Sequence, residues 1–133
     1  MREEWEHASR TGDALALARL ADAGLDINAR DAHGQTGLML AANRGHAAAV
    51  MCLIARGADL NHTAKFHLSA LMLAVICNHR EVVRALVEVG ADLSIRGTGA
   101  PGFHGFTALD LAAAQGADDL VAILNGTSGK GDA

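Results

Sequence analysis

Residues 31–61 read DAHGQTGLMLAANRGHAAAVMCLIARGADLN, and this stretch returns along the chain at a fixed spacing. Thr36-Gly-Leu38 recurs as Ser69-Ala-Leu71, and Gly57-Ala-Asp-Leu recurs as Gly90-Ala-Asp-Leu, both 33 positions later. Self-similarity at a period of this size is typical of a repeat array, in which each unit buries its apolar face by stacking on its neighbour. The sequence therefore predicts a solenoid of small units rather than one globular core.

Length, charge and composition are consistent with such an array. A chain of 133 residues suits one compact unit. Its 11 basic and 15 acidic residues give a net charge of −4, which argues against nucleic acid as a partner, because that binding needs clustered Lys and Arg. Hydrophobic residues make up 50% of the chain but aromatic ones only 3%, and alanine is abundant, which favours close contact between helices.

Three features predict a cytoplasmic protein. The first ten residues, MREEWEHASR, are charged and contain no apolar segment of the kind that a signal peptide needs. No run approaches the roughly 18 apolar residues that span a membrane. Cys52 and Cys77 stand alone, outside any CxxC or zinc-ligand spacing, so we expect two reduced thiols. We also expect a monomer.

Projecting the repeat along the chain predicts an all-α solenoid of four helix-turn-helix units joined by hairpin loops. The predicted units are residues 1–30, 31–63, 64–96 and 97–126, and the tail 127–133 has the composition of a disordered segment. Thr36, Ser69 and Thr107 are predicted N-caps of the first helices. Glycine follows each helix, and Asn78 replaces Gly45 in the third unit, where asparagine also tolerates a left-handed backbone.

The same alignment predicts which apolar side chains face the interior. In the second unit a helix from Thr36 to Arg44 is followed by one over Ala47–Arg56, with Cys52 on its inner side. The other predicted core positions in the four units are Trp5, Ala8, Leu15, Leu17 and Leu20; Leu38, Ala41, Ala42, Val50 and Leu53; Leu71, Ala74, Val75, Val82, Val83, Leu86 and Val87; and Leu109, Ala112, Ala113, Leu120, Val121, Ile123 and Leu124.

The pattern G-x-T-x-L-x-x-A-A-x-x-G-H…V…L…G-A-D-x-N resembles the ankyrin repeat, over about residues 1–125 in four copies. The Thr-Pro-Leu-His signature of that family is altered to Thr-Gly-Leu-Met at 36–39, Ser-Ala-Leu-Met at 69–72 and Thr-Ala-Leu-Asp at 107–110. Its alanine-rich, Met-substituted style is similar to that of bacterial ankyrin proteins. The resemblance implies a binding scaffold without catalytic chemistry or cofactor, whose partner protein meets the concave face of hairpins and first helices.

Positions on the expected concave face that the repeat leaves free are the candidate binding site. All three phenylalanines fall there, and aromatic side chains are favoured anchors at interfaces. We expect Phe66, Leu68, Ile76 and Phe103 to anchor the partner in an apolar strip, although folding back to seal the loop is an equal alternative. The complete predicted partner-binding set is His33, Asn43, Arg44, Lys65, Phe66, Leu68, Ile76, Cys77, Phe103, His104, Phe106 and Gln115.

An alternative function is a small-ligand or metal sensor. The loop from Ser94 to Thr107 spans 13 positions where the second and third units have 8, and the insertion gives a Gly-rich segment at 97–105. Histidines at 33, 62, 67 and 104 lie near hairpins, but they form no HxH or HxxxH pair, and no phosphate-binding motif is present. We therefore expect no metal site. His46 and His79 recur at one repeat position, so a structural role is expected for both.

An enzyme is not expected, because no nucleophile stands beside a base in the pattern. Ser69 and Thr107 are assigned to helix caps, and Asp59 and Asp92 recur in the turns between units. Cys77 aligns with Arg44 and Gln115, both at expected exposed positions, and has no neighbouring base in the pattern to activate its thiol.

Overall fold

The computed structural model of the chain describes residues 1–99 and 103–126, so the predicted disordered tail at 127–133 lies outside the described residues. Helices account for all of the regular structure there, as the sequence predicts, apart from two isolated bridges in the loops. The helices are α1 (Glu3–Thr11), α2 (Ala14–Asp22), α3 (Gly37–Asn43), α4 (Ala47–Ala55), η1 (Lys65–His67), α5 (Ala70–Ile76), α6 (Arg80–Glu88), α7 (Ala108–Ala114) and α8 (Asp118–Leu124).

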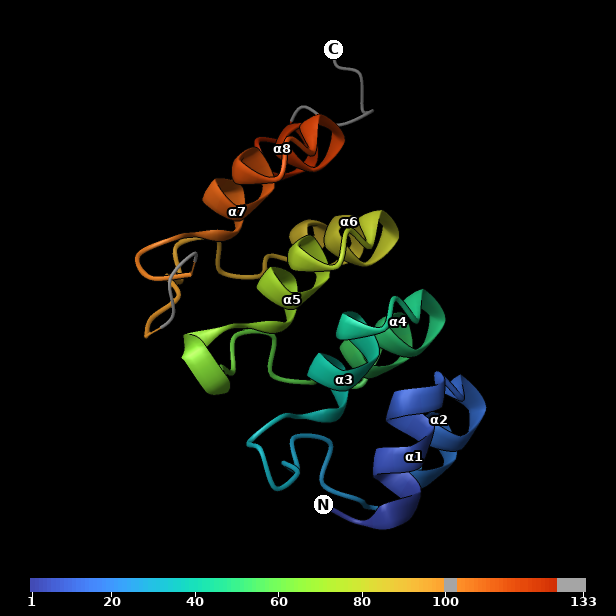
Figure 1. The fold of residues 1–133 in the computed structure, drawn as a ribbon. Coiled ribbons are helices and arrows are strands. Elements are labelled where there is room, and N and C mark those ends of the chain that lie inside the picture. The colour runs from blue at the N-terminus through green and yellow to red at the C-terminus, as the bar shows by residue number, and fades with distance from the viewer. Residues whose placement is uncertain (100–102, 127–133) are drawn as a thin grey trace.

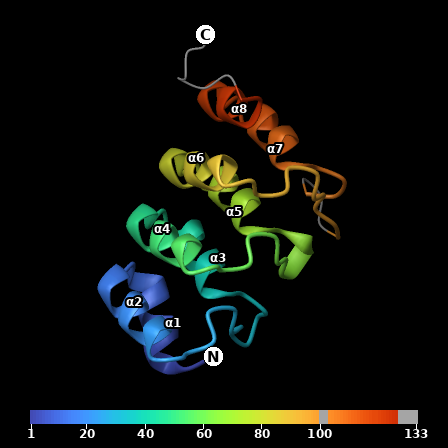
Figure 2. The ribbon, with the colours of Figure 1, turned by 180° about the vertical axis from the view of Figure 1, so that it is seen from behind.

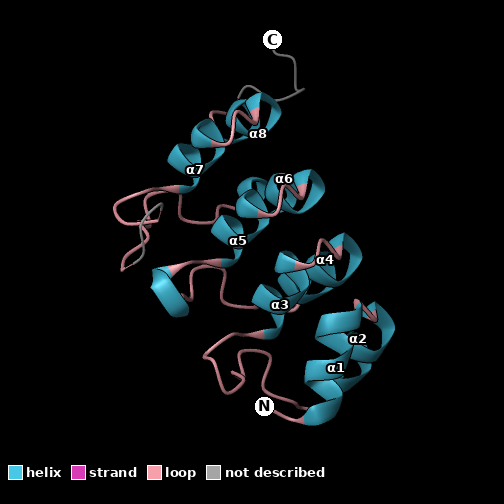
Figure 3. Ribbon diagram, viewed as in Figure 1, coloured by secondary structure: helices cyan, strands magenta, loops and turns pink. Residues whose placement is uncertain are grey.

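The α-helices form four antiparallel pairs that stack in chain order (Figure 1). The first helices of the pairs, α1, α3, α5 and α7, pack in one row, and the second helices, α2, α4, α6 and α8, pack in another. Seen from behind, the loops that precede α3, α5 and α7 all project from the same side of the stack (Figure 2). Figure 3 shows that these projections are loops apart from η1. The fold is an all-α helix-turn-helix solenoid.

The first helices of units two to four, α3, α5 and α7, each begin at the predicted cap. The hydroxyl oxygens of Thr36 and Ser69 accept hydrogen bonds, both of 3.3 Å, from the backbone amides of Met39 and Met72. Thr107 completes a capping box, because its hydroxyl accepts from the Asp110 amide and the Asp110 carboxylate accepts from the Thr107 amide. Since a cap fixes where a helix starts, the three hairpins enter the stack in the same way.

In units two and three, a histidine hydrogen-bonds to the preceding unit near the break between its two paired helices. His46 Nε2 lies 2.9 Å from the carbonyl oxygen of Arg10, and His79 Nε2 lies 3.0 Å from that of Asn43. The imidazole of His79 rests on Gly45, where an added Cβ would lie 2.5 Å from Nδ1. These contacts confirm the structural role expected for both histidines. Asn78 takes the left-handed conformation of its glycine counterparts, with φ 60°, as predicted.

The turns that follow the second helices are joined by another set of repeated hydrogen bonds. Asn28 Oδ1 accepts from the amide of Asp59 at 2.9 Å, and Asn61 Oδ1 accepts from the amide of Asp92 at 2.8 Å. Asp59 and Asp92 in turn accept bonds from backbone amides two residues later. The aspartates of the turns are therefore structural, as the repeat predicts.

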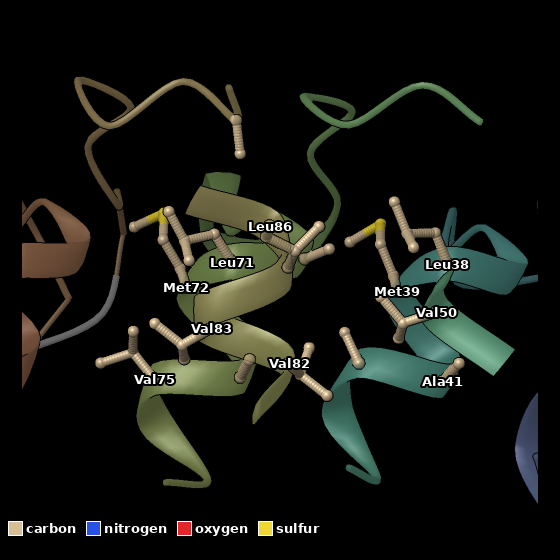
Figure 4. Close-up of a cluster of buried hydrophobic side chains, with 14 of the residues drawn as sticks. Leu38, Met39, Ala41, Val50, Leu71, Met72, Val75, Val82, Val83 and Leu86 are labelled. Atoms are coloured by element: carbon tan, nitrogen blue, oxygen red, sulfur yellow. The ribbon is translucent and has the colours of Figure 1, made fainter. Parts of the chain in front are cut away.

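The core runs continuously through the stack rather than filling a single centre. Figure 4 shows Leu38 and Met39 of α3 on one side and Leu71 and Met72 of α5 on the other, with Leu86 of α6 between these two pairs of side chains. All five side chains are at most 2% exposed. Each unit thus contributes a layer that its neighbours cover, which is how short helices with small apolar faces become stable.

Three predicted core positions are wrong, for two different reasons. Leu15 is 81% exposed, because it lies two residues, or about 200° of helical rotation, from the fully buried Leu17 of α2. Leu109 is 36% exposed and Ala113 is also exposed, since no described helix pair follows α7 and α8 to cover that face as α5 covers α3. Cys52, expected on the inner side of α4, is half-buried.

Candidate functional site

The predicted partner-binding residues lie on the projecting loops and at the carboxyl ends of the first helices. Figure 1 shows these loops side by side along one flank of the stack. Their exposure differs: Leu68 is buried; Asn43, Phe66, Ile76, Phe103 and Phe106 are half-buried; and His33, Arg44, Lys65, Cys77, His104 and Gln115 are exposed.

The expectation that Leu68 is an exposed anchor is wrong, because its side chain is only 5% exposed and belongs to the core cluster. It follows η1 in an extended conformation and directly precedes the cap Ser69. Its carbonyl oxygen accepts from the amide of Ala64 at 3.2 Å, which closes the hairpin over it. The position before the cap therefore faces inward in this unit.

Phe66 and Phe103 meet, and we call this pair the aromatic clamp. Their ring centroids are 5.6 Å apart with the ring planes inclined by 45°, a favourable tilted arrangement. Two hydrogen bonds reinforce the contact. The Thr98 amide donates to the Phe66 carbonyl at 2.8 Å, and Nδ1 of the His67 ring lies 2.9 Å from the Arg96 carbonyl oxygen. The clamp joins the hairpin of the third unit to the loop that precedes the fourth.

The sequence left two arrangements of the phenylalanines open, an apolar strip on the surface and rings that fold back to seal the loop. The structure combines features of both. Phe66 and Phe103 come together as expected, but all three rings are half-buried and pack against the core. Phe106 closes its own loop, because its carbonyl accepts from Gly97 at 2.9 Å and its amide donates to Phe103 at 3.0 Å. What remains accessible is the outer part of the aromatic clamp.

The backbone under the clamp is strained, which the sequence did not reveal. Phe66 has φ 62° and ψ 18°, and His67 has φ 60°, so two consecutive residues with side chains adopt left-handed conformations. For such residues the left-handed conformation costs roughly 1–2 kcal/mol each. The bonds to Thr98 and Arg96 hold them there, and strain of this kind tends to gather at functional sites.

The inserted loop is ordered where it is described. Gly97 approaches the backbone of Phe103 so closely that a Cβ would collide with its carbonyl oxygen, and Gly97 also forms a bridge with His104. Arg96 Nη1 donates to the Gly105 carbonyl at 2.7 Å. Both ends of the loop are therefore fixed against the clamp, while residues 100–102 of the predicted Gly-rich segment lie outside the described residues.

Side-chain hydrogen bonds connect the first helices across the concave face. Cys77 Sγ donates to Asn43 Oδ1 at 3.1 Å, and Gln115 Nε2 donates to the Ile76 carbonyl at 3.3 Å. Each bond runs from one unit to the preceding one. Residues that the sequence assigns to partner recognition therefore also hold the units in register.

Both carboxylates on this face are already engaged. Asp31 Oδ1 accepts from the amides of His33 and Gln35, both at 2.9 Å, and Oδ2 lies 3.6 Å from Nη2 of Arg10, an ion-pair rather than a hydrogen-bond distance. Asp110 sits in its capping box, where hydrogen bonds from the amide and hydroxyl of Thr107 lower the pKa of its carboxyl group. The Asp31 side chain is 4% exposed and so is withdrawn from the surface, whereas that of Asp110 is 50% exposed.

The hairpin histidines divide into two kinds. His62 Nε2 lies 2.9 Å from the Gly34 carbonyl oxygen, and His67 bonds to Arg96, so both hold loops together. Among the described residues, the side chains of His33 and His104 have no hydrogen-bond partner. No three His, Cys, Asp or Glu side chains gather in the described part of the chain in a way that could hold a metal ion.

The sequence interpretation missed an apolar surface on α4, one of the second helices α2, α4, α6 and α8, which we call the outer helices. Met51 of α4 is 58% exposed, and α4 reads AAAVMCLIA, with no polar face. In α6 the aligned surface carries Glu81, Arg84 and Glu88. A shallow hollow of about 180 Å³ lies between α4 and α6 beside Met51. Counting charges at aligned positions of the second helices would have revealed it.

Comparison with known proteins agrees with the fold. A family model described as ankyrin repeats matches residues 5–97 in three copies, which is more than half of the chain. A search of curated proteins finds no match. None of the described helices has the length and apolar character needed to cross a membrane. Ankyrin repeats are generally protein–protein interaction modules and are typically non-catalytic. With its repeat period, its capped helix pairs and this match, the chain belongs to the ankyrin-repeat family.

Proposed function

We propose that this chain is a non-catalytic module that binds a segment of another protein on its concave face, formed by the hairpin loops and by α3, α5 and α7. The observation that carries the proposal is the aromatic clamp. Phe66 and Phe103 are drawn together at 5.6 Å on the projecting loops, over a strained backbone, instead of being buried in the stack. Accessible aromatic groups on a rigid support are typical anchors for a partner.

The surroundings of the clamp favour recognition by a preformed surface. Hydrogen bonds from Cys77 and Gln115 tie the first helices together, and those of Thr98 and His67 tie the loops. Because these groups are already ordered, binding loses little conformational entropy in the scaffold. Lys65 is exposed beside the clamp and Arg44 is exposed at the carboxyl end of α3, and both supply polar specificity.

The proposed module works as a monomer in the cytoplasm. Its two cysteines are free thiols, and each thiol donates to a different unit, Cys52 to the Ala14 carbonyl at 3.6 Å and Cys77 to Asn43. Reduced thiols suit that compartment. Sedimentation equilibrium tests the first part of this proposal, and a mass that rises to twice that of the chain over the concentration range would contradict it.

Site-specific photo-cross-linking in cells tests the proposed face. A photoreactive amino acid is placed at Gln115 or His104 on the concave face, and at Met51 or Val89 on the outer helices and turns; all four positions are exposed. We expect one partner protein to be cross-linked from the first two positions only. Cross-links to that partner from positions 51 and 89, with none from 104 and 115, would contradict the proposal.

The captured partner then allows the clamp to be tested directly. Phe66→Ala combined with Phe103→Ala should weaken binding at least about tenfold, because truncating anchor residues typically costs more than about 1 kcal/mol each. Leu15→Ala is the matched control, since it truncates a side chain that is 81% exposed on the outer helix α2. Equal affinity of the double variant and wild type would show that the clamp is not the anchor.

A further inference from the structure

Charge is distributed unevenly between the two sides of the stack. We define the concave segments as residues 29–45, 62–78 and 95–116, which hold the hairpins and first helices of units two to four. They contain four basic residues against two acidic ones. The second helices and turns, residues 12–28, 46–61, 79–94 and 117–126, contain four basic residues against nine acidic ones. In a chain of net charge −4, the concave segments of units two to four are therefore cationic, whereas residues 1–11 add two basic and three acidic residues at the first end of the stack.

The cationic character persists when existing contacts are considered. The two carboxylates of the concave segments, Asp31 and Asp110, are held by backbone amides, and the side chain of Asp31 is only 4% exposed. Arg96 is the one base of these segments that lies near a carboxylate, 4.0 Å from Asp110. The remaining cations face no competing carboxylate on this surface.

Three cations of the concave segments have no acidic partner in the described part of the chain. Arg30, Arg44 and Lys65 are all exposed, and none forms an ion pair there. Lys65 lies with Nζ 5.0 Å from the centroid of the Phe66 ring, so a positive charge sits beside the aromatic clamp. On the second helices, Arg56 and Arg80 pair with Asp22 and Asp119 at 3.2 Å, while Arg19 and Arg84 form no ion pair in the described residues.

We propose that the segment bound on the concave face is an acidic, extended peptide. This inference rests on the proposed function and names the chemistry of its partner. Asp or Glu side chains of the peptide meet Arg30, Arg44 and Lys65, and an apolar side chain rests on the aromatic clamp. Complementary charge speeds association and selects partners, and Arg offers a planar fork that matches a carboxylate.

A nucleic acid fits this surface less well than an acidic peptide. Only three unpaired cations are available, and the acidic outer helices repel a long polyanion. A short peptide with a few carboxylates meets the concave side alone. The salt dependence separates the two classes, because neutralising many phosphates gives a far steeper loss of affinity with salt than a few exposed ion pairs do.

Selection from a random-peptide display library on the full chain tests the inference. We expect the enriched sequences to combine Asp or Glu with an apolar residue. Fluorescence polarisation with one selected, labelled peptide then measures how charge-reversal and charge-neutralising variants of the concave cations bind. Arg44→Glu with Lys65→Glu should weaken binding at least about tenfold at about 0.05 M salt, with a smaller difference at about 0.5 M. Arg44→Gln with Lys65→Gln, which adds no negative charge, should give a smaller loss.

The matched control is Arg19→Glu with Arg84→Glu, which changes the net charge equally on the outer helices, where neither arginine forms an ion pair in the described residues. It should change the affinity less than about twofold. Equal weakening by both charge-reversal pairs would overturn the inference, because net charge alone would then explain binding. Displacement of the acidic peptide by an equal concentration of a single-stranded oligonucleotide would also overturn it, in favour of nucleic acid.

The design separates failure of the inference from failure of the proposed function. Selected peptides that lack acidic residues, but lose binding in the Phe66→Ala and Phe103→Ala double variant, would overturn the inference and leave the proposed function standing. If no selected peptide loses binding in any concave variant, the proposed function itself is contradicted. Circular dichroism of each variant confirms that the helices are intact before affinities are compared.

Discussion

Glycine at the helix breaks does two things at once in this chain. Gly45 adopts φ 76°, which side chains disfavour, and it also leaves room for the ring of His79 from the next unit. Gly12 accommodates His46 in the same way. A single atom added at either position would both strain the backbone and displace a hydrogen bond between units. The glycine of one unit and the histidine of the next therefore form a single packing contact that repeats between neighbouring units.

Gly45→Ala should destabilise the chain more than Gly57→Ala. Both glycines have positive φ, so each alanine costs roughly 1–2 kcal/mol of backbone strain. Only at Gly45 does the new Cβ meet a neighbour, 2.5 Å from His79 Nδ1, whereas nothing lies within 4 Å at Gly57. We expect about 1 kcal/mol of additional loss, the worth of the His79 hydrogen bond. Urea unfolding measures the difference, and equal losses would contradict this account.

Asp110 should make the stability of the last unit dependent on pH. Hydrogen bonds from Thr107 lower the pKa of Asp110 from its ordinary value of 3.8, so the stabilisation is present above that value and is lost as the pH falls through the folded-state pKa. Asp110→Asn keeps an acceptor oxygen but does not ionise. Between about pH 5 and about pH 2 the unfolding free energy of this variant should fall less than that of wild type. Parallel pH profiles would contradict the assignment.

At the scale of elements, the inserted loop and the hairpin of the third unit behave as one structure. The clamp, the Thr98 amide and the His67 ring connect Phe66 and His67 to Arg96, Thr98 and Phe103. This connection explains why two left-handed residues persist at Phe66 and His67, since neither segment alone supplies the bonds that hold them. The loop stabilises the surface on which a partner is proposed to bind.

A double-mutant cycle on Phe66→Ala and Phe103→Ala should show coupling. Tilted aromatic pairs contribute about 0.5–1.5 kcal/mol beyond burial, so the double variant should lose less stability than the sum of the single losses by about that amount. Urea unfolding gives all four values. The pair Phe103→Ala and Leu15→Ala serves as the control cycle, because Leu15 lies on α2 in the first unit. Additive losses for the clamp pair would contradict a direct contact.

The period of the sequence was enough to predict the helix pairs but not the shape of the loops. Caps, helix breaks and the turns after the second helices recur at 33 residues from the second unit to the third, and the cap and the break return after the insertion in the fourth; each has a local cause that can be recognised without a structure. Phe66 and His67 give no such signal, because contacts with Arg96, Thr98 and Phe103 impose their conformation. Leu68 was misplaced for a related reason, since the turn of η1 decides which way the residue before the cap points.

The described part of the chain is a stack in which the main contacts of each helix pair are with the pairs next to it. Such arrays are expected to lose their end units more easily than their central ones. Trp5 is the only tryptophan and is fully buried in the first unit, so its fluorescence reports on that end of the stack. Circular dichroism reports on all helices together. Comparing the two signals shows whether the stack unfolds as a whole.

Leu120→Ala and Leu86→Ala should differ in which parts of the stack they destabilise. Both side chains are fully buried, so each substitution costs about 2–5 kcal/mol locally. Leu86 is central, and its loss should lower the urea midpoints of both signals. Leu120 belongs to α8 at the other end, and its loss should lower the midpoint by circular dichroism more than that of Trp5 fluorescence. Coincident shifts for Leu120→Ala would contradict the stacked, neighbour-only account.

The central claim is that a partner occupies the concave side. Hydrogen–deuterium exchange of the full chain, with and without an acidic peptide obtained by selection, tests it most directly. Slower exchange should appear in residues 62–68 and 95–99 and at the carboxyl ends of α3, α5 and α7, while α2, α4, α6 and α8 remain unchanged. Slower exchange confined to the outer helices, with none in the hairpins, would contradict the account.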